Sequence, residues 1–576
     1  MDQSPNEKLL EKGLSLLDQA AYEAAFQLLS KYIQEDPADG AGYYGRGVAR
    51  IGMEDFEGAV DDLSRAIDLD PKDDYSWCER GQAKANLGLY EEAVMDLDMA
   101  IELVNDSSAL FYNRGIIHAD FNNLHAAVED YTQAIRLEND FTNAWYNRGI
   151  AYWDMDRHED AISDFSTAIT LDSRKADAWH ARAQARCESG DVDNAYEDIM
   201  QALELCPEES DYQISLGIIK LSLNDPEGAL ADFDKAIELE PDNAMAYFNR
   251  GCCHHDFGRL YEAIEDYSKT LELDPEYPKA YHNRGVIFER MGHRERAYAD
   301  YNRSITLDPT DYQALTSFGE AMHREGNYDE AMELYNRALL IKPDYVSTWR
   351  NRGGLKRDMG MLESAKADYS RASFLEPKEE DAWFGRAYIK ELLGDLEGAL
   401  DDYNHFDGLQ HDDPNLYHNR GCLLYLMHRW QESLDDLLHY CEQVPGDDPA
   451  LAYIQARIFF IRLRLGNKKE AISLLTRFIE DYAESADEDP WQLALLLFLA
   501  GESTEKELLE QAQLYAEEGF DTCLSEAYYH IGTMYLVNEE TQKAITWFHK
   551  CVELNVPDHV PTSTARMELK NLGEQG

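Results

Sequence analysis

Small and large apolar residues recur along this chain with a period of 34 residues. When each repeat is numbered so that its first glycine stands at position 8, that position is glycine or alanine from Gly13 to Gly421, without an insertion or deletion. Position 20 is alanine from Ala25 to Ala399, and positions 4 and 24 hold large side chains such as Trp145 and Phe165. Proline is frequent at position 32, where it would end a helix. Small residues let two helices approach and large ones fill the space beside them, so the pattern predicts a helix-turn-helix solenoid.

This pattern resembles the tetratricopeptide repeat (TPR) family over thirteen in-register repeats, residues 6–445. The resemblance implies an all-α, right-handed superhelical solenoid, in which the first helix of each repeat lines a concave groove. It also implies a non-enzymatic adaptor that binds other proteins.

The register is lost after Pro445. Residues 446–524 are expected to form degenerate repeats, with one repeat placed at 452–485 around Gly466 and Ala471. A final repeat is expected at 525–558 and a capping helix with a tail at 559–576, which gives about 16 repeats in all. The stretch 525–573, which contains SEAYYHIGTMYL, AITWFHKCVELNVPD and ARMELKNLG, also resembles the C-terminus of NlpI-type bacterial TPR adaptors, although we do not expect the lipid-anchored N-terminus of that class here.

Composition narrows the choice of partners. The net charge is −59, which argues against nucleic acid and anionic membranes because both require a positive surface. No apolar run is long enough to span a membrane, and MDQSPNEKLLEKG does not read as a secretory signal. Nine cysteines without a C-x-x-C pair favour reduced thiols, so we expect a cytoplasmic protein.

Arginine at position 7 accompanies aspartate at position 23 of the same repeat. The tenth repeat, with Phe318 and Leu334, loses both together, so we expect an Arg–Asp bridge within each repeat and a structural role for it. The expected pairs are Arg46–Asp62, Arg80–Asp96, Arg114–Asp130, Arg148–Asp164, Arg182–Asp198, Arg250–Asp266, Arg284–Asp300, Arg352–Asp368, Arg386–Asp402 and Arg420–Asp436.

Asparagine recurs at position 6, which the family places on the concave face. An asparagine amide both donates and accepts, so a row of them could bind the backbone of an extended peptide. The row resembles the asparagine ladder in the repeat domain of O-linked N-acetylglucosamine transferase. The alternative is that the amides bind solvent or a neighbouring helix. The residues are Asn113, Asn147, Asn249, Asn283, Asn351 and Asn419.

One stretch departs from the acidic background: residues 279–371 carry 15 Lys plus Arg against 14 Asp plus Glu. Cations at groove positions there could bind an acidic or phosphorylated segment. The alternative is that they pair with Glu289, Glu320 and Asp358. The cations are Lys279, His282, Arg290, His323, Arg324, Arg350 and Arg357.

The sequence CCHH at 252–255 suggests zinc, but successive helical residues point about 100° apart, so all four cannot face one ion. We expect no metal site. We also expect no cofactor and no enzyme, because the chain has no nucleotide-binding loop, nucleophile elbow or metalloprotease motif.

Two functions remain open. The first is an adaptor whose groove binds an extended segment of a protein, acidic or phosphorylated in one version. The second is a scaffold that forms homo-oligomers through its C-terminal capping region, which exposed apolar surface at 491–501 would support.

Overall fold

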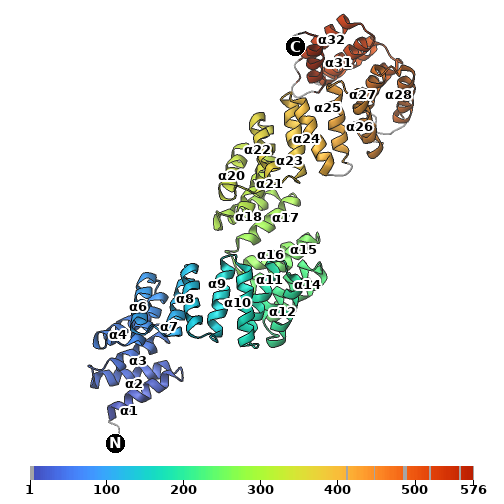
Figure 1. Ribbon diagram of the computed structural model, residues 1–576. Coiled ribbons are helices and arrows are strands. Elements are labelled where there is room, and N and C mark those ends of the chain that lie inside the picture. Colours follow the sequence, from blue (N-terminus) through green and yellow to red (C-terminus); the bar gives the residue numbers. More distant parts are fainter. Residues whose placement is uncertain are drawn as a thin grey trace. The chain divides into compact units, whose positions relative to one another are not determined.

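A computed structural model describes residues 5–409, 413–446, 448–483, 490–517, 521–554, 556 and 560–574 (Figure 1). All regular structure in these ranges is helical, as expected. The helices are α1 (Pro5–Leu17), α2 (Tyr22–Glu35), α3 (Gly40–Ile51), α4 (Phe56–Leu69), α5 (Asp74–Asn86), α6 (Tyr90–Leu103), α7 (Ser108–Asp120), α8 (Leu124–Leu137), α9 (Thr142–Asp154), α10 (His158–Leu171), α11 (Ala176–Glu188), α12 (Val192–Leu205), α13 (Ser210–Ser222), α14 (Pro226–Leu239), α15 (Ala244–Asp256), α16 (Leu260–Leu273), α17 (Pro278–Arg290), α18 (Arg294–Leu307), α19 (Tyr312–Arg324), α20 (Tyr328–Ile341), α21 (Val346–Asp358), α22 (Leu362–Leu375), α23 (Glu380–Leu392), α24 (Leu396–Leu409), α25 (Pro414–Leu426), α26 (Trp430–Gln443), α27 (Leu451–Arg464), α28 (Lys468–Ala483), α29 (Pro490–Ala500), α30 (Glu505–Glu517), α31 (Asp521–Val537), α32 (Thr541–Glu553) and α33 (Val560–Asn571).

The chain divides into two units, Met1–Asp300 and Tyr301–Gly576, each of which is a stack of antiparallel helical hairpins. From α3 to α26 the helices follow the 34-residue register: the first helix of a hairpin occupies roughly positions 1–13 and the second positions 17–30. The solenoid architecture inferred from the sequence pattern is therefore confirmed within each unit.

Close approach of the two helices explains the small residue at position 8. A Cβ atom on Gly149 would lie 2.6 Å from the ring of Phe165, which is fully buried at position 24 of the same hairpin. The turn that follows the first helix has a glycine in the left-handed region in many hairpins, for example Gly190 with φ +86°. Sequence and packing thus impose the same hairpin in each repeat.

Curvature within each unit places the first helices on the inner side. In the first unit α3 contacts α5, α5 contacts α7 and α7 contacts α9, and in the second α19 contacts α21 and α21 contacts α23. The second helices of neighbouring hairpins lie farther apart. Since elements on the inside of a curve are closer together, positions 2, 5, 6, 9, 12 and 13 of the first helices face a groove.

The end of the second unit folds back on itself. Tyr529 on α31 donates to Tyr425 on α25 (3.4 Å), and Glu568 on α33 forms an ion pair with Arg464 on α27 (3.2 Å). In the stretch 491–501 the side chains of Trp491, Leu495, Leu496 and Leu499 are at most 3 % exposed. This apolar stretch is therefore part of the core of the unit.

Candidate functional site

The arginines at position 7 bind the aspartates at position 23 of their own hairpins. In all ten pairs Nε and Nη2 donate to the two carboxylate oxygens over 2.6–2.9 Å. The aspartates are buried, Asp198 being 2 % exposed. Planar, two-bonded geometry of this kind fixes the rotation of one helix against the other.

The same arginines also reach the preceding hairpin, which the sequence did not reveal. In nine of the ten, Nη1 donates to the side chain at position 25 of the repeat before, as from Arg148 to Thr132 Oγ1 (2.9 Å) and from Arg250 to Asp234 (2.6 Å). Arg386 instead donates to Ser373 (3.1 Å) at position 28 of the repeat before. Each arginine thus joins three helices and orients neighbouring repeats as well as the two helices of its own hairpin. The recurrence of serine, threonine, asparagine or aspartate at position 25 could have predicted this contact from the sequence.

A second cation often shares the aspartate. Lys84 Nζ lies 2.7 Å from Asp96, and Arg186 Nη1 lies 2.6 Å from Asp198, both from position 11 of the first helix. The recurrence of lysine or arginine at that position could have predicted this contact. Two cations on one carboxylate leave the cluster positive, which suits an acidic chain.

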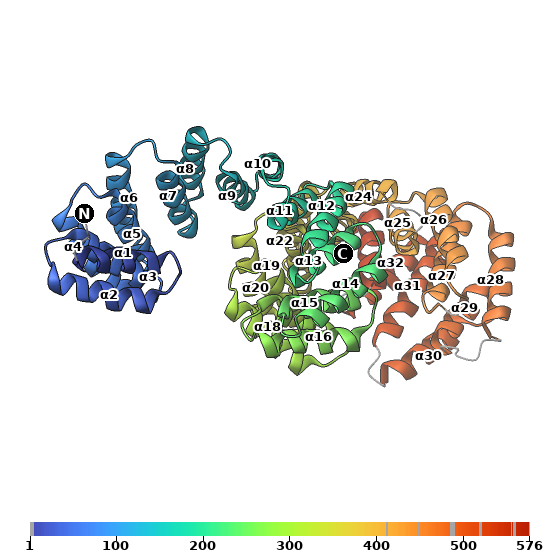
Figure 2. The same ribbon diagram turned by 90° about the horizontal axis from the view of Figure 1, so that it is seen from below.

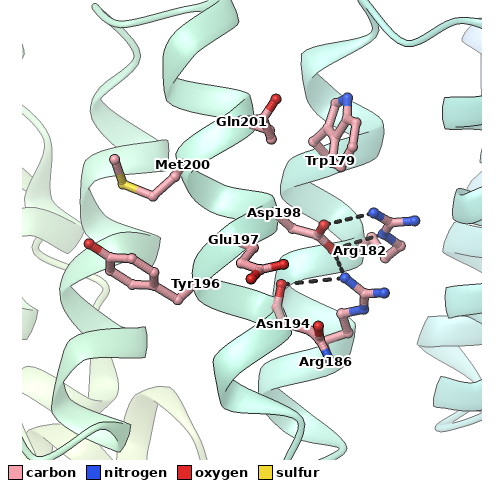
Figure 3. Close-up of a pocket in the computed structure, with 9 residues that line it drawn as sticks. All are labelled: Trp179, Arg182, Arg186, Asn194, Tyr196, Glu197, Asp198, Met200 and Gln201. Carbon is pink, nitrogen blue, oxygen red and sulfur yellow. Dashed lines mark hydrogen bonds and ion pairs between the residues drawn. The ribbon is translucent and has the colours of Figure 1, made fainter.

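Aromatic residues at position 4 cover these clusters. The guanidinium carbon of Arg182 lies 4.9 Å from the Trp179 ring, whose Nε1 donates to Ser173 O (3.0 Å) in the preceding connection. Figure 3 shows Arg182 and Arg186 converging on Asp198 in a surface pocket of ≈ 580 Å³. Because these polar groups already bond one another, the pocket is a by-product of the scaffold.

The groove asparagines of the first unit are held by the preceding hairpin in three of four cases. Asn147 Nδ2 donates to Tyr112 Oη (3.0 Å), Asn113 Nδ2 to Cys78 Sγ (3.4 Å), and Asn283 Nδ2 to Cys252 Sγ (3.5 Å). Asn249 instead donates to Met245 O of its own helix (2.8 Å). All four side chains are half-buried, so each amide is oriented but still accessible.

The two asparagines of the second unit differ from each other. Asn351 Nδ2 lies 3.5 Å from Glu320 of the preceding hairpin, whereas Asn419 donates to Asn415 O of its own helix (2.9 Å). Both are half-buried. In four of the six asparagines the amide group therefore donates one hydrogen bond to a neighbouring helix, as the alternative interpretation expected. The row of asparagines is less uniform than the sequence suggests.

The expected anion patch falls across the boundary between the units, with Lys279, His282 and Arg290 in the first and the other four cations in the second. In the second unit Arg324 binds Glu320 (2.5 Å), and Arg350 binds Glu379 (3.1 Å) and Asp381 (2.7 Å).

Two cations of the second unit share one acid. His323 Nε2 and Arg357 Nε lie 2.9 and 2.7 Å from the carboxylate oxygens of Asp358. These contacts follow the pairing alternative: every one of the four cations has an acidic neighbour on the same or an adjacent first helix.

The side chains of the CCHH stretch diverge. Cys252 accepts from Asn283, Cys253 is buried with Sγ 3.7 Å from Pro226 O, and His254 Nε2 lies 3.9 Å from Asp266. Among the described residues no group of three or more His, Cys, Asp or Glu side chains is placed to hold a metal ion.

A half-buried histidine in the groove, His180, gives the first unit a pH dependence. Burial lowers the pKa of His180 to about 4, well below the usual value near 6.5. Its Nε2 lies 2.8 Å from Ser215 Oγ, and its ring packs on Tyr212.

We expect the first unit to lose stability as pH falls from about 6.5 to about 4, because the unfolded chain takes up a proton that the folded chain refuses. Denaturant titrations at pH 7 and 5 would measure the loss. The variant His180→Phe, which copies Phe248 and Phe384 at position 5 of other repeats, should show a smaller loss. An equal loss in both proteins would contradict the assignment.

Comparison with known families follows the same register. Models described as tetratricopeptide repeat match residues 44–108, 142–175, 176–209, 210–243, 233–265, 282–346, 450–485 and 525–555, and one described as TPR repeat matches 117–156 and 254–292. Together they cover more than half of the chain. No curated protein matches it.

Solved structures with a similar fold share little sequence with the chain. The Cut9–Hcn1 hetero-tetramer of the APC/C is 15% identical, covers 73% of this chain and 97% of its own, and gives a TM-score of 0.41. Yeast Tom70 is 19% identical, covers 78% and 98%, and gives 0.36. YrrB, described as a TPR protein with an unusual peptide-binding site, is 25% identical, covers 34% and 99%, and gives 0.26.

Among the described residues no helix is both long and apolar enough to cross a membrane.

Proposed function

Because this chain belongs to the tetratricopeptide-repeat family, we propose that it is a non-enzymatic adaptor that binds an extended segment of another protein in its groove. The observation that carries the proposal is the setting of the groove asparagines in the first unit. Asn113, Asn147 and Asn283 are half-buried, and each has one amide hydrogen bound to the preceding hairpin. That contact orients the side chain.

An amide oriented in this way retains a carbonyl oxygen and a second N–H. Within the described part of the chain neither group has a protein partner in Asn113 or Asn147. A peptide backbone offers a complementary N–H and C=O at each residue, so the pair can bind main chain with little regard to sequence. Tyr112 and Tyr146 at position 5 supply aromatic surface beside them.

Fewer cations than the sequence suggested support a preference of the groove for acidic segments. A phosphorylated or acidic segment would have to displace Glu320, Asp358, Glu379 and Asp381 from the cations of the second unit. Lys279 and Arg290 on α17 are exposed and have no carboxylate within 4.0 Å among the described residues. We therefore assign any attraction for acidic segments to these two side chains.

Self-association through the C-terminal cap is the weaker alternative. Trp491, Leu495 and Leu499 are buried within the second unit, so the apolar stretch that would have supported it offers little surface. The cap also contacts its own chain through Glu568 and Tyr529.

The test is a peptide selected from a displayed library against the full chain, with affinity measured by fluorescence anisotropy. The variant Asn113→Ala/Asn147→Ala should bind the peptide about tenfold more weakly or worse, since two hydrogen-bonding side chains are removed. The matched control is Gln133→Ala/Gln201→Ala, which removes two exposed amides from the second helices α8 and α12. Equal affinity of all three proteins would place the peptide elsewhere.

A further inference from the structure

Two large apolar side chains stand in solvent on neighbouring second helices of the second unit. Leu340 on α20 is 84% exposed and Phe374 on α22 is 73% exposed. Both occupy position 29, where other repeats carry glutamate: Glu102, Glu204, Glu238, Glu272 and Glu442. A position that is charged or polar in most other repeats is thus apolar in two successive repeats.

Three arginines accompany them at position 26. Arg303, Arg337 and Arg371 belong to α18, α20 and α22, which are neighbours along one side of the unit in Figures 1 and 2. None has a carboxylate within 4.0 Å among the described residues, although most arginines of this acidic chain do, and Arg371 lies 5.5 Å from the Phe374 ring. We call these five residues the basic–apolar ridge.

The first unit carries a surface of opposite character. On α6 Met95 is 65% exposed, Met99 38% and Leu103 37%, at spacings of four residues that place them on one face. Exposed Glu91, Glu92 and Glu102 flank them and have no cationic partner within the described residues. We call these six residues the methionine stripe.

We propose that the methionine stripe of one copy of this chain docks on the basic–apolar ridge of another copy. Apolar side chains would meet Leu340 and Phe374 while the glutamates meet Arg303, Arg337 and Arg371. From Met95 to Leu103 a helix rises about 12 Å. The second helices α20 and α22 are separated by the first helix α21 of the hairpin between them and lie farther apart than the roughly 8–10 Å of directly packed helices, so a stripe of this length can reach both Leu340 and Phe374. Flexible methionines adapt readily to such a surface.

The occupant is a second copy because both complementary halves are found in this chain. The net charge of −59 opposes self-association at long range. At physiological ionic strength the screening length is about 8 Å, so distant repulsion is damped while direct contacts persist. The contact joins two different surfaces, so it does not saturate at a dimer unless a ring closes.

Sedimentation velocity on the full chain tests this. We expect the mass of the wild-type protein to rise with concentration. It should either exceed the mass of a dimer or reach the constant mass of a closed ring. The ridge variant Leu340→Glu/Phe374→Glu and the stripe variant Met95→Glu/Met99→Gln should each remain monomeric. Both should fold, because other repeats hold Glu at position 29, Glu at position 22 (Glu129, Glu197) and Gln at position 26 (Gln133, Gln201).

Mixing the ridge variant with the stripe variant tests whether the two surfaces bind each other. One retains a stripe and the other a ridge, so the mixture should form a one-to-one complex and stop there. The control Gln34→Glu/Thr170→Glu adds the same charge at exposed position-29 sites away from the ridge and should associate like wild type.

Three results would overturn the proposal: a monomeric wild-type protein over the whole concentration range, a stripe variant that still associates, or a mixture of the two variants that stays monomeric. If the ridge instead bound a synthetic acidic helix but not the chain itself, the occupant would be a different protein and the proposal would be wrong.

Discussion

Replacing Asp164 with leucine is expected to destabilise the α9–α10 hairpin by about 3–5 kcal/mol, because Arg148 is left as a buried, uncompensated cation. The side chains of Arg148 and Asp164 are only 13% and 6% exposed, and they are joined by bonds of 2.6 and 2.9 Å. Burial raises the pKa of Asp164 despite the opposing hydrogen bonds from Arg148, so removal of this carboxylate from water is costly. Asp164 has no second cation among the described residues, which makes the pair a clean one to test.

The double variant Arg148→Phe/Asp164→Leu should recover most of that loss. It copies the tenth repeat, where Phe318 and Leu334 stand at the same two positions and are 7% and 4% exposed. Amide hydrogen exchange of α9 and α10 in the full chain would measure both changes locally. A double variant as unstable as Asp164→Leu would mean that the bridge contributes net stability, and its assignment as a device that mainly orients the two helices would be wrong.

Replacing Glu568 with leucine is expected to release α33 from the inside of the second unit, at a cost of about 3 kcal/mol or more. Glu568 is 4% exposed, and its Oε1 lies 3.2 Å from Arg464 Nη2. Arg464 has no other carboxylate within 4.0 Å among the described residues, and it stacks on Trp430 at 4.8 Å. Loss of the acid leaves this cation half-buried and unpaired.

Hydrogen exchange in α33 and α27 should therefore rise together in Glu568→Leu. The variant Arg464→Met/Glu568→Leu removes both charges and should exchange closer to the wild-type rate. Faster exchange confined to α33, with α27 unchanged, would show that the two helices do not stabilise each other.

Most of the fold could be predicted from the 34-residue register. Thirteen copies without insertion specify where each helix begins, so the bounds of α3 to α26 could be predicted closely, and the joint loss of Arg and Asp in the repeat of Phe318 and Leu334 identified the bridge partners. Beyond Pro445 the period fades, and the way α31 and α33 return to α25 and α27 depends on contacts between residues about 100 apart, such as Tyr425 with Tyr529. The local sequence pattern cannot predict contacts between residues so far apart in the chain.

The groove was harder to predict than the scaffold. Four of the six asparagines at position 6 bind a side chain at position 5 or 9 of the preceding repeat. Asn147 meets Tyr112, but Asn249 follows Ile214 and Ile218, which offer no hydrogen-bond partner, so it turns to its own helix. The paired arginines show the same limit, since Arg350 could be placed in the groove from sequence while its bonds to Glu379 and Asp381 could not.

Photo-crosslinking in the source organism's lysate tests the adaptor function most directly. A crosslinking amino acid would replace Ile150, a groove residue at position 9 of α9, or Gln133 on the outer helix α8 of the preceding hairpin. We predict that the crosslinker at position 150 captures one or more proteins, and that mass spectrometry finds the crosslink within a short segment of each captured protein. The replacements Asn113→Ala/Asn147→Ala should abolish this capture. Capture through position 133 alone, or capture at 150 that survives the asparagine replacements, would contradict the adaptor function.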